Sequence, residues 1–248
     1  MRILLKMFSF LLVAGAMVGC SKNDDEDEGG SNWKPNLGDY DPVPLSDFDN
    51  AFYKWCVSKF DATGDGILQY GEIKTIKKLD FNKHYDKAEF ESLRGIKYFT
   101  SLTYVWDYNG WTCENMETLD VSHNLMLDTL RLGNKPKLKS LLLGKKDYLE
   151  YLTFESSQVA SIDVSKCPKL KEMVCHYGKL TSLDVTKNTA LERLSCNDNL
   201  FTSLDVSKNR QLKELFVPSS LQILYVWKGW SKPDYGWRYP ESVQIIEK

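Results

Sequence analysis

Twelve consecutive residues, Asp61 to Glu72, place oxygen-bearing side chains at positions 1, 3, 5, 9 and 12 of one segment, with Gly66 at position 6. Ca²⁺ takes about six to eight hard oxygen ligands in irregular geometry, and a loop of this length with a glycine turn and a closing glutamate supplies them. The predicted ligands are five side chains and the main-chain carbonyl at position 7: Asp61, Thr63, Asp65, Ile67, Gln69 and Glu72. We therefore expect this loop to bind one calcium ion.

This EF-hand-like loop departs from the common pattern in two respects. Thr63 stands where Asp or Asn is usual, and the loop occurs once, whereas calcium sensors pair two. Both departures predict modest affinity, on the order of the 10⁻⁴–10⁻³ M of extracellular modules, and a structural role for the ion. The alternative interpretation is a metal-free turn that keeps the shape of the motif.

Groups suited to covalent or acid–base chemistry are few. The chain has three histidines, and the adjacent Cys175 and His176 suggest a thiol–imidazole pair. Neighbouring residues of a strand point to opposite faces, and Cys175 stands at a position otherwise held by leucine, so it should face inward and His176 outward. The sequence contains no GxSxG, HExxH or phosphate-binding glycine motif. We expect a protein that is not an enzyme.

The framework that must position these residues is an internal repeat of 21 residues. The segment from Thr181 to Asn188 recurs from Thr202 to Asn209 with nearly the same residues. Related copies lie upstream at 117–124 and 160–166, and a degraded copy lies between them at 139–143. Self-similarity at a fixed period predicts stacked structural units that share one core.

A second series with the same period lies between these segments. It has the form L-x-x-L-x-L, and its members are Leu127/Leu130/Leu132, Leu149/Leu152/Phe154, Leu170/Met173/Cys175, Leu191/Leu194/Cys196 and Leu212/Leu215/Val217. A further copy at Leu102/Val105 has Asp107 in the third place. Periods of about 20–29 residues with this spacing mark the leucine-rich repeat. The expected fold is a strand-rich leucine-rich-repeat solenoid of the α/β repeat class, with little helix.

Three sets of residues recur with the repeat and are expected to be structural. Buried amides should bond turn backbone at Asn124, Asn188, Asn199 and Asn209. A solvated edge, rather than a metal site, should form where Asp120, Asp163, Asp184 and Asp205 are balanced by Lys166, Lys187 and Lys208. Cys175 and Cys196 hold the same place in successive repeats, so we expect them on neighbouring rungs about 5 Å apart.

Solenoids expose apolar surface at their end rungs and need caps. At the N-terminal end, Ser46 is expected to cap a helix whose apolar face is Phe48, Ala51, Phe52, Trp55, Cys56 and Phe60. At the other end the aromatic residues are Tyr225, Trp227, Trp230, Tyr235, Trp237 and Tyr239. They are predicted to form a C-terminal cap, and a stacking platform for sugar rings is the alternative.

The first residues predict export and anchoring. Arg2 and Lys6 precede an apolar run that is too short for a membrane span and ends at Gly19-Cys20. This arrangement resembles the bacterial lipobox, in which the signal is cut before a cysteine that receives lipid, so Cys20 is the predicted lipidation site. The alternative is an ordinary signal peptide with an incidental cysteine. An acidic run at 24–28 follows in a flexible linker, similar to signals that send lipoproteins to the outer face of the outer membrane.

The charge balance bears on partners. The chain has 32 Lys and Arg against 34 Asp and Glu; without Arg2, Lys6, Lys22 and the five acids at 24–28, the rest of the chain has 29 of each. It therefore lacks the basic excess expected of a nucleic-acid-binding protein.

The order of parts resembles a group of bacterial surface leucine-rich-repeat lipoproteins with 21-residue repeats, in which the first rung follows a calcium-type loop. The resemblance covers roughly residues 42 to 226 and implies adhesion or protein binding without naming a ligand. The predicted regions are a signal peptide (1–19), an acidic linker (20–41), an EF-hand-like cap (42–82), the solenoid (83–226) and an aromatic cap (227–248).

The outward-facing residues of the L-x-L strands are the candidate binding surface. The ligand-binding candidates among them are Tyr104, Trp106, Tyr108, Arg131, Tyr151, His176, Arg193 and Phe216. A mixed polar and aromatic face is typical of a surface that binds proteins. We expect a protein partner at the cell surface; the alternative is a glycan bound by the Trp- and Tyr-rich C-terminal segment.

Overall fold

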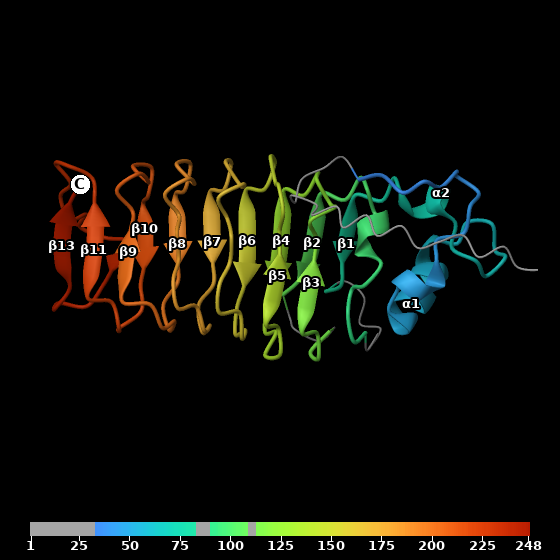
Figure 1. Cartoon of the computed structure of the whole chain (residues 1–248), viewed down its shortest axis with the longest axis horizontal. Helices are drawn as coiled ribbons and strands as arrows, with labels where there is room; N and C mark the ends of the chain where they lie inside the picture. The colour runs from blue at the N-terminus through green and yellow to red at the C-terminus, as the bar shows by residue number, and fades with distance from the viewer. Residues whose placement is uncertain (1–32, 83–89, 109–112) are drawn as a thin grey trace, which may run out of the picture.

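The computed structural model describes residues 33–82, 90–108 and 113–248. The chain winds into an elongated coil in which successive turns stack along one axis, with the helices at the N-terminal end (Figure 1). Each turn adds one strand to a long parallel sheet. The predicted leucine-rich-repeat solenoid is confirmed.

The long sheet has eight strands in the order β1-β2-β4-β6-β7-β8-β10-β12. Their bounds are β1 Lys78–Asp80, β2 Tyr104–Asp107, β4 Thr129–Leu132, β6 Tyr151–Phe154, β7 Glu172–Val174, β8 Arg193–Ser195, β10 Glu214–Phe216 and β12 Trp237–Arg238. Every neighbouring pair is parallel and in register, so that Leu152 lies opposite Met173 and Met173 opposite Leu194. The register follows the repeat because a shift by one residue would turn the leucines out of the core.

A second, interrupted layer forms from the repeats that contain the aspartates. It consists of the pair β3 Thr118–Asp120 and β5 Ser140–Leu142, and the sheet of β9 Ser203–Asp205, β11 Ile223–Val226 and β13 Gln244–Glu247. An isolated bridge joins Asp184 to Asp205 between them. Helix in the described residues is confined to the N-terminal part: 3₁₀ turns at Leu45–Asp47 and Ile96–Tyr98, α1 at Asn50–Phe60 and α2 at Tyr70–Ile73.

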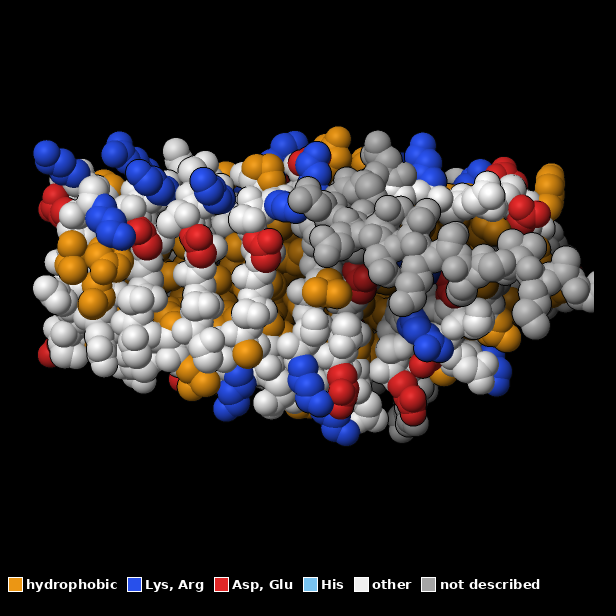
Figure 2. Space-filling view, viewed as in Figure 1, with side chains coloured by type: hydrophobic (Ala, Val, Ile, Leu, Met, Phe, Trp, Pro, Cys, Tyr) orange, Lys and Arg blue, Asp and Glu red, His pale blue; other side chains and the backbone are white. Residues whose placement is uncertain are grey.

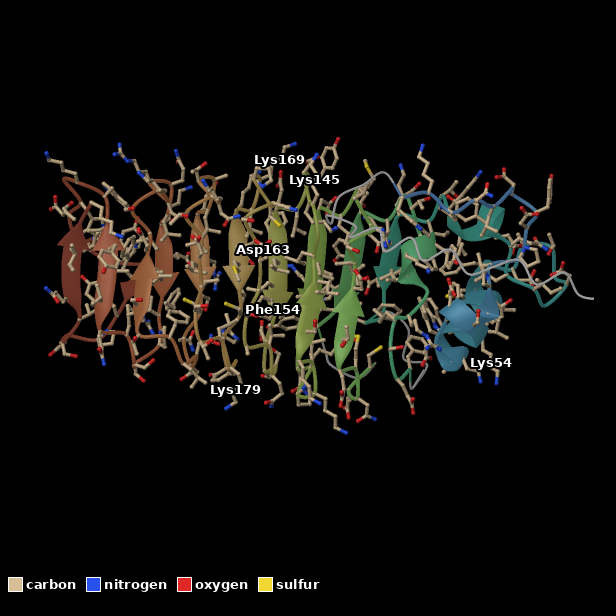
Figure 3. The ribbon with its side chains drawn as sticks, viewed as in Figure 1. Lys54, Lys145, Phe154, Asp163, Lys169 and Lys179 are labelled. Carbon is tan, nitrogen blue, oxygen red and sulfur yellow. The ribbon has the colours of Figure 1, made fainter. Side chains whose placement is uncertain are left out.

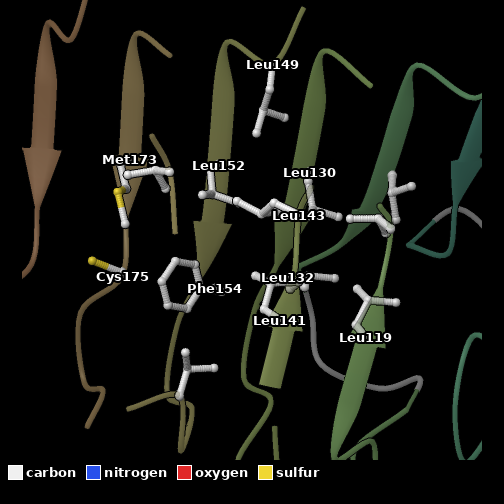
Figure 4. Packing of buried hydrophobic residues seen from close by; sticks show 14 of the residues in the cluster. Leu119, Leu130, Leu132, Leu141, Leu143, Leu149, Leu152, Phe154, Met173 and Cys175 are labelled. Carbon is white, nitrogen blue, oxygen red and sulfur yellow. The ribbon is translucent and has the colours of Figure 1, made fainter. Parts of the chain in front are cut away.

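The core lies between the two layers. Leucines of both repeat series interleave there with Phe154, Met173 and Cys175 (Figure 4). Cys175 and Cys196 are fully buried on neighbouring rungs, and the Cys175 amide donates to the carbonyl of Ser195 at 2.8 Å, as the predicted register requires. All five cysteines of the described residues are buried free thiols, and burial raises the pKa of the Cys175 thiol.

The asparagine amides bond turn backbone as predicted. Asn188 Nδ2 donates to the carbonyls of Val164 and Cys167 at 2.8 and 2.9 Å, one coil earlier. Asn124 and Asn209 make equivalent pairs of bonds, whereas Asn199 bonds the carbonyl of Cys175 one coil earlier and that of Cys196 in its own coil. Buried carbonyls need partners, so each amide joins consecutive coils at a turn that the strands leave unpaired.

Two buried lysines interrupt this pattern, and nothing in the repeat predicts them. Lys146 stands at the repeat position of Asn124; it is fully buried, and its Nζ donates to the carbonyls of Ser122 and Lys145, both at 3.3 Å. Lys135 is also fully buried, and its Nζ lies 2.7 Å from Oδ2 of Asp107. Asp107, the residue that breaks the leucine pattern, is thus a buried carboxylate compensated from the next coil.

The predicted aspartate edge lies on the second layer. Figure 2 shows acidic side chains over this layer, with Lys and Arg side chains along the adjoining edge, and Figure 3 places Asp163 among them. Each aspartate accepts the amide two residues on, as Asp163 does from Ser165 at 2.9 Å and Asp184 from Thr186 at 2.9 Å. Hydrogen bonds donated by Ser165 lower the pKa of Asp163, and those donated by Thr186 lower the pKa of Asp184. The row is a structural series of turns.

The N-terminal cap differs from the prediction at its start. Asp49, not Ser46, caps α1: its Oδ1 accepts the Phe52 amide at 2.9 Å. Ser46 lies instead in the 3₁₀ turn that follows Pro44, and the chain extends again at Phe48 before the helix begins. Phe52 is fully buried and stacks on Phe99 at 6.1 Å, so the helix covers the first coil as expected.

The C-terminal aromatic residues cover the last coil. Trp237 is buried, its ring centroid lies 6.1 Å from that of Trp227 and 5.4 Å from that of Trp230, and both of these pack against the core. Residues 227–248 also contain β12 and β13, so they extend both layers by one coil. At the N-terminal end, the predicted solenoid begins at residue 83, but β1 at Lys78–Asp80 already belongs to the long sheet.

The predicted signal peptide, the predicted lipidation site Cys20 and most of the predicted acidic linker lie outside the described residues. No helix in the described part of the chain is both long and apolar enough to cross a membrane.

Candidate ligand-binding site

The exposed face of the eight-stranded sheet, here called the sheet face, carries all eight predicted ligand-binding residues. Strand register aligns one row of outward side chains across seven strands: Trp106, Arg131, Thr153, Val174, Ser195, Phe216 and Arg238. Tyr104, Tyr151 and Arg193 lie in the row on one side of it, and Tyr108 and His176 follow the strands on the other side. The face is rigid because every strand is hydrogen-bonded to its neighbours.

A hollow of about 340 Å³ lies in this face. It is lined by five of the predicted residues, Trp106, Tyr108, Arg131, His176 and Arg193, together with Thr153, Glu155, Glu172 and Val174. Tyr104 and Tyr151 flank this group, and Phe216 lies beyond it on β10. The hollow exists because Thr153 and Val174 are small, whereas Trp106 and Arg131, which precede them in the same row, are large.

Aromatic side chains form one end of the hollow. Trp106 is 36% exposed, and its ring meets Tyr104 edge-on at 5.7 Å. Tyr108 is 45% exposed, and the charge of Glu155 and a hydrogen bond to it raise the pKa of this phenol. Both rings are therefore held in place by neighbours before any ligand arrives.

The charged groups around the hollow are paired. Arg131 lies 3.2 Å from Glu172 and over the ring of Tyr151 at 5.7 Å, and Arg193 lies 3.4 Å from Glu214. These ion pairs are partly exposed, so each contributes little to stability. Their effect is to fix long side chains in position, which lowers the entropy lost on binding.

His176 connects two further side chains. Its Nε2 lies 3.1 Å from Glu155 Oε2, and its Nδ1 lies 3.3 Å from Ser195 Oγ. A serine, an imidazole and a carboxylate in line are the parts of an activated nucleophile. Ser195 is only 5% exposed, and its Oγ also donates to Asn197 Oδ1 at 3.3 Å, so its hydroxyl is already engaged. The contacts with Glu155 and Ser195 therefore orient the imidazole of His176. His176 faces outward and Cys175 inward, as predicted, and they form no pair.

The residues of the predicted EF-hand-like loop form a tight hydrogen-bonded turn. Gly64 and Gly66 take positive φ values of 73° and 78°, a conformation that favours glycine. Asp61 accepts the Gly66 amide at 2.8 Å, and hydrogen bonds led by this one lower the Asp61 pKa. Glu72 accepts the amides of Ala62 at 2.8 Å and Gln69 at 2.9 Å, which closes the loop.

The oxygen donors of this loop suit Ca²⁺ in kind. Their carboxylates are turned onto loop amides, and the described residues contain no group of three or more His, Cys, Asp or Glu side chains placed to hold a metal. The helix that follows the loop, α2, is also only four residues long. A bound ion would have to draw Asp61, Asp65 and Glu72 inward. Calcium binding stays a prediction.

A larger hollow of about 950 Å³ lies between the N-terminal cap and the second layer. Its acidic and basic groups largely satisfy one another; Asp47, for example, lies 2.7 Å from Lys97 and accepts the Tyr98 hydroxyl at 2.6 Å. None of the predicted binding residues lines it.

No protein-family model matches the chain, and no curated protein matches its sequence. Among solved structures it is similar to the functional domain of InlJ from Listeria monocytogenes, which includes a cysteine ladder: 19% identity, TM-score 0.34, covering 77% of this chain and 53% of that one. It is also similar to internalin C2 of the same organism, with 17% identity and a TM-score of 0.30, covering 71% of this chain and 96% of that one. A leucine-rich-repeat protein of Leptospira interrogans has 18% identity and a TM-score of 0.30, covering 64% of this chain and 52% of that one. The chain spans about half the length of the first and third. All these TM-scores lie below 0.5, so the fold assignment rests on the coil geometry of this chain.

Proposed function

We propose that this protein is a cell-surface lipoprotein that binds a protein partner through the sheet face. The observation that supports this most directly is the cluster of the exposed rings of Trp106 and Tyr108 with the half-buried Arg131 in the lining of the hollow. Trp, Tyr and Arg are the residues that dominate binding energy at protein interfaces, especially next to pockets that exclude water.

The size and rigidity of the sheet face fit a protein partner. Eight strands at about 4.8 Å spacing extend over roughly 34 Å, which is long enough for a standard interface of about 800 Å² per partner. The ion pairs of Arg131 and Arg193 hold polar groups ready around the aromatic centre. An interface with an aromatic centre and a polar rim has this composition.

Anchoring and calcium are further parts of the proposal. Lipid on Cys20 would tether the protein to the outer membrane, and the acidic linker would hold the solenoid away from the lipid surface. Calcium in the 61–72 loop would stabilise the N-terminal cap. Both rest on the sequence patterns that predict them.

The alternative, a glycan bound by the C-terminal aromatic segment, has less support. Trp237 is buried, and Trp227 and Trp230 pack against the core, so these rings act as a cap. Tyr235, 86% exposed, stands apart from them as the most open ring of the segment.

The proposal is tested by probing purified extracellular proteins with the soluble protein and measuring each hit by biolayer interferometry. Trp106→Ala and Arg131→Ala should each weaken a true hit at least tenfold, a loss of about 1.4 kcal/mol or more. The matched controls are Tyr148→Ala and Lys169→Ala, because these two exposed residues form a cation–π pair at 4.9 Å and do not line the hollow. Figure 3 shows Lys169 at a coil turn. Hits that bind all four variants as they bind the parent would refute a protein site on the sheet face.

A further inference from the structure

The floor of the hollow is made by two small side chains on adjacent strands. Thr153 on β6 and Val174 on β7 lie side by side in register, and both line the hollow. Trp106 on β2 lies two strands from Thr153, with Arg131 on the strand between them. At about 4.8 Å per strand, the backbones of Trp106 and Val174 are roughly 14 Å apart, which leaves a short trough with room for one small ring.

The floor holds a hydroxyl without a partner. Thr153 is 1% exposed and lines the hollow, and its Oγ1 has no hydrogen-bond partner among the described residues. A buried polar group normally has a hydrogen-bond partner, and a ligand is one explanation for a group that has none. A group that both donates and accepts, such as a ligand hydroxyl, would satisfy it.

The charges around the trough exclude a strongly charged ligand. Two arginines, Arg131 and Arg193, are balanced by two glutamates, Glu155 and Glu172, so the lining is formally neutral when His176 is neutral. Each arginine already lies against a glutamate, and Glu155 lies against His176. What remains open on these planar groups is their capacity to form hydrogen bonds with uncharged donors and acceptors.

The end wall supplies an apolar contact. Trp106 and Tyr108 are exposed rings fixed by Tyr104 and Glu155. An aromatic face is large, rigid and apolar, and it matches the C–H face of a sugar ring whose hydroxyls point outward at the rim.

We infer that the trough binds one uncharged sugar ring, stacked on Trp106 with a hydroxyl bonded to Thr153 Oγ1. This inference rests on the proposed function in that the sheet face is the binding surface. The sugar belongs either to a free polysaccharide or to the glycan of a glycoprotein partner; the chemistry of the trough is the same for both.

The experiment screens the purified chain against neutral oligosaccharides and their sialylated and sulfated counterparts, and titrates the best neutral oligosaccharide by calorimetry. Trp106→Ala should weaken binding at least tenfold. Thr153→Val should weaken it about three- to tenfold. It preserves shape and removes a hydroxyl that makes no protein hydrogen bond, so the melting temperature should not fall. Tyr148→Ala, an exposed aromatic control, should bind as the parent does.

Two arms separate the sources of the sugar. The oligosaccharide is offered free and then on a carrier glycoprotein, before and after enzymatic removal of its glycans. Binding to the free oligosaccharide indicates a polysaccharide ligand, and binding only to the glycosylated carrier indicates a glycoprotein.

The inference is overturned by a preference for the charged glycans, by the absence of any neutral hit, or by full binding in the Thr153→Val and Trp106→Ala variants. A protein partner that needs Trp106 but binds Thr153→Val normally, and still binds after deglycosylation, would overturn the sugar site and leave the proposed function standing. If a neutral glycan binds the parent but binds Thr153→Val more weakly, and no protein binds at all, the sugar site stands and the proposed protein-binding function is overturned.

Discussion

Replacing the buried Lys146 by methionine is expected to change how the stability of the protein depends on pH. Lys146 occupies an asparagine position of the repeat, is fully buried, and has two carbonyl oxygens as hydrogen-bond partners. Burial lowers its pKa from 10.5 to about 8. Methionine keeps an unbranched apolar side chain in the same space and removes the titrating group.

The sign follows from the two pKa values. The folded pKa is the lower one, so the folded protein holds the proton less tightly than the unfolded chain does. Lys146 therefore destabilises the fold fully below pH 8, and the penalty disappears as the pH rises past 10.5. With about 1.4 kcal/mol for each tenfold change in proton affinity, the penalty is about 3 kcal/mol at pH 7 and about 1 kcal/mol at pH 10.

Urea unfolding of the parent and Lys146→Met at pH 7 and pH 10 measures this penalty. The free energy of unfolding of the variant, relative to the parent, should fall by about 2 kcal/mol between pH 7 and pH 10. Loss of the two carbonyl contacts affects both pH values alike and cancels in this comparison. Lys145→Met is the control, because Lys145 is exposed and pairs with Asp147 at 2.8 Å. A difference between parent and Lys146→Met that stays constant from pH 7 to pH 10 would refute the reasoning.

Three further predictions concern the coil, the loop and the anchor. Asn188→Ala removes two buried hydrogen bonds between consecutive coils, so the free energy of unfolding should drop by about 1–3 kcal/mol in urea melts; a change below about 0.5 kcal/mol would mean that the amide does not join the coils. Millimolar calcium should raise the melting temperature, by about 1.4 kcal/mol of stability at tenfold excess over Kd, and Glu72→Ala should abolish the rise; an unchanged curve up to about 10 mM calcium would identify the loop as a plain turn. Cys20→Ser should move the protein from the membrane fraction to the soluble one, and unchanged fractionation would contradict lipidation at this residue.

The 21-residue period predicts the solenoid, its register and the residues that face outward. In a stacked coil each repeat meets only its neighbours, so the place of a residue in the repeat sets its environment. Leu152, Met173 and Leu194 could therefore be aligned from the period alone, and the amide of Asn188 could be assigned to turn backbone. The same periodicity put Trp106 and Arg131 on one face. Fold and candidate surface were predictable because both follow from local position.

How charged side chains compensate one another between coils depends on packing and could not be predicted from the period. The pairing of Asp107 with Lys135 depends on which neighbouring turn carries the opposite charge, and the period contains no information about it. The choice of Asp49 over Ser46 as the helix cap depends on where Phe48 is buried. Residues 227–248 lack the leucine pattern, and yet they form a coil because the edge of β10 offers backbone partners to β12. The hollow, likewise, arises from the relative sizes of side chains on adjacent strands, which only packing brings together.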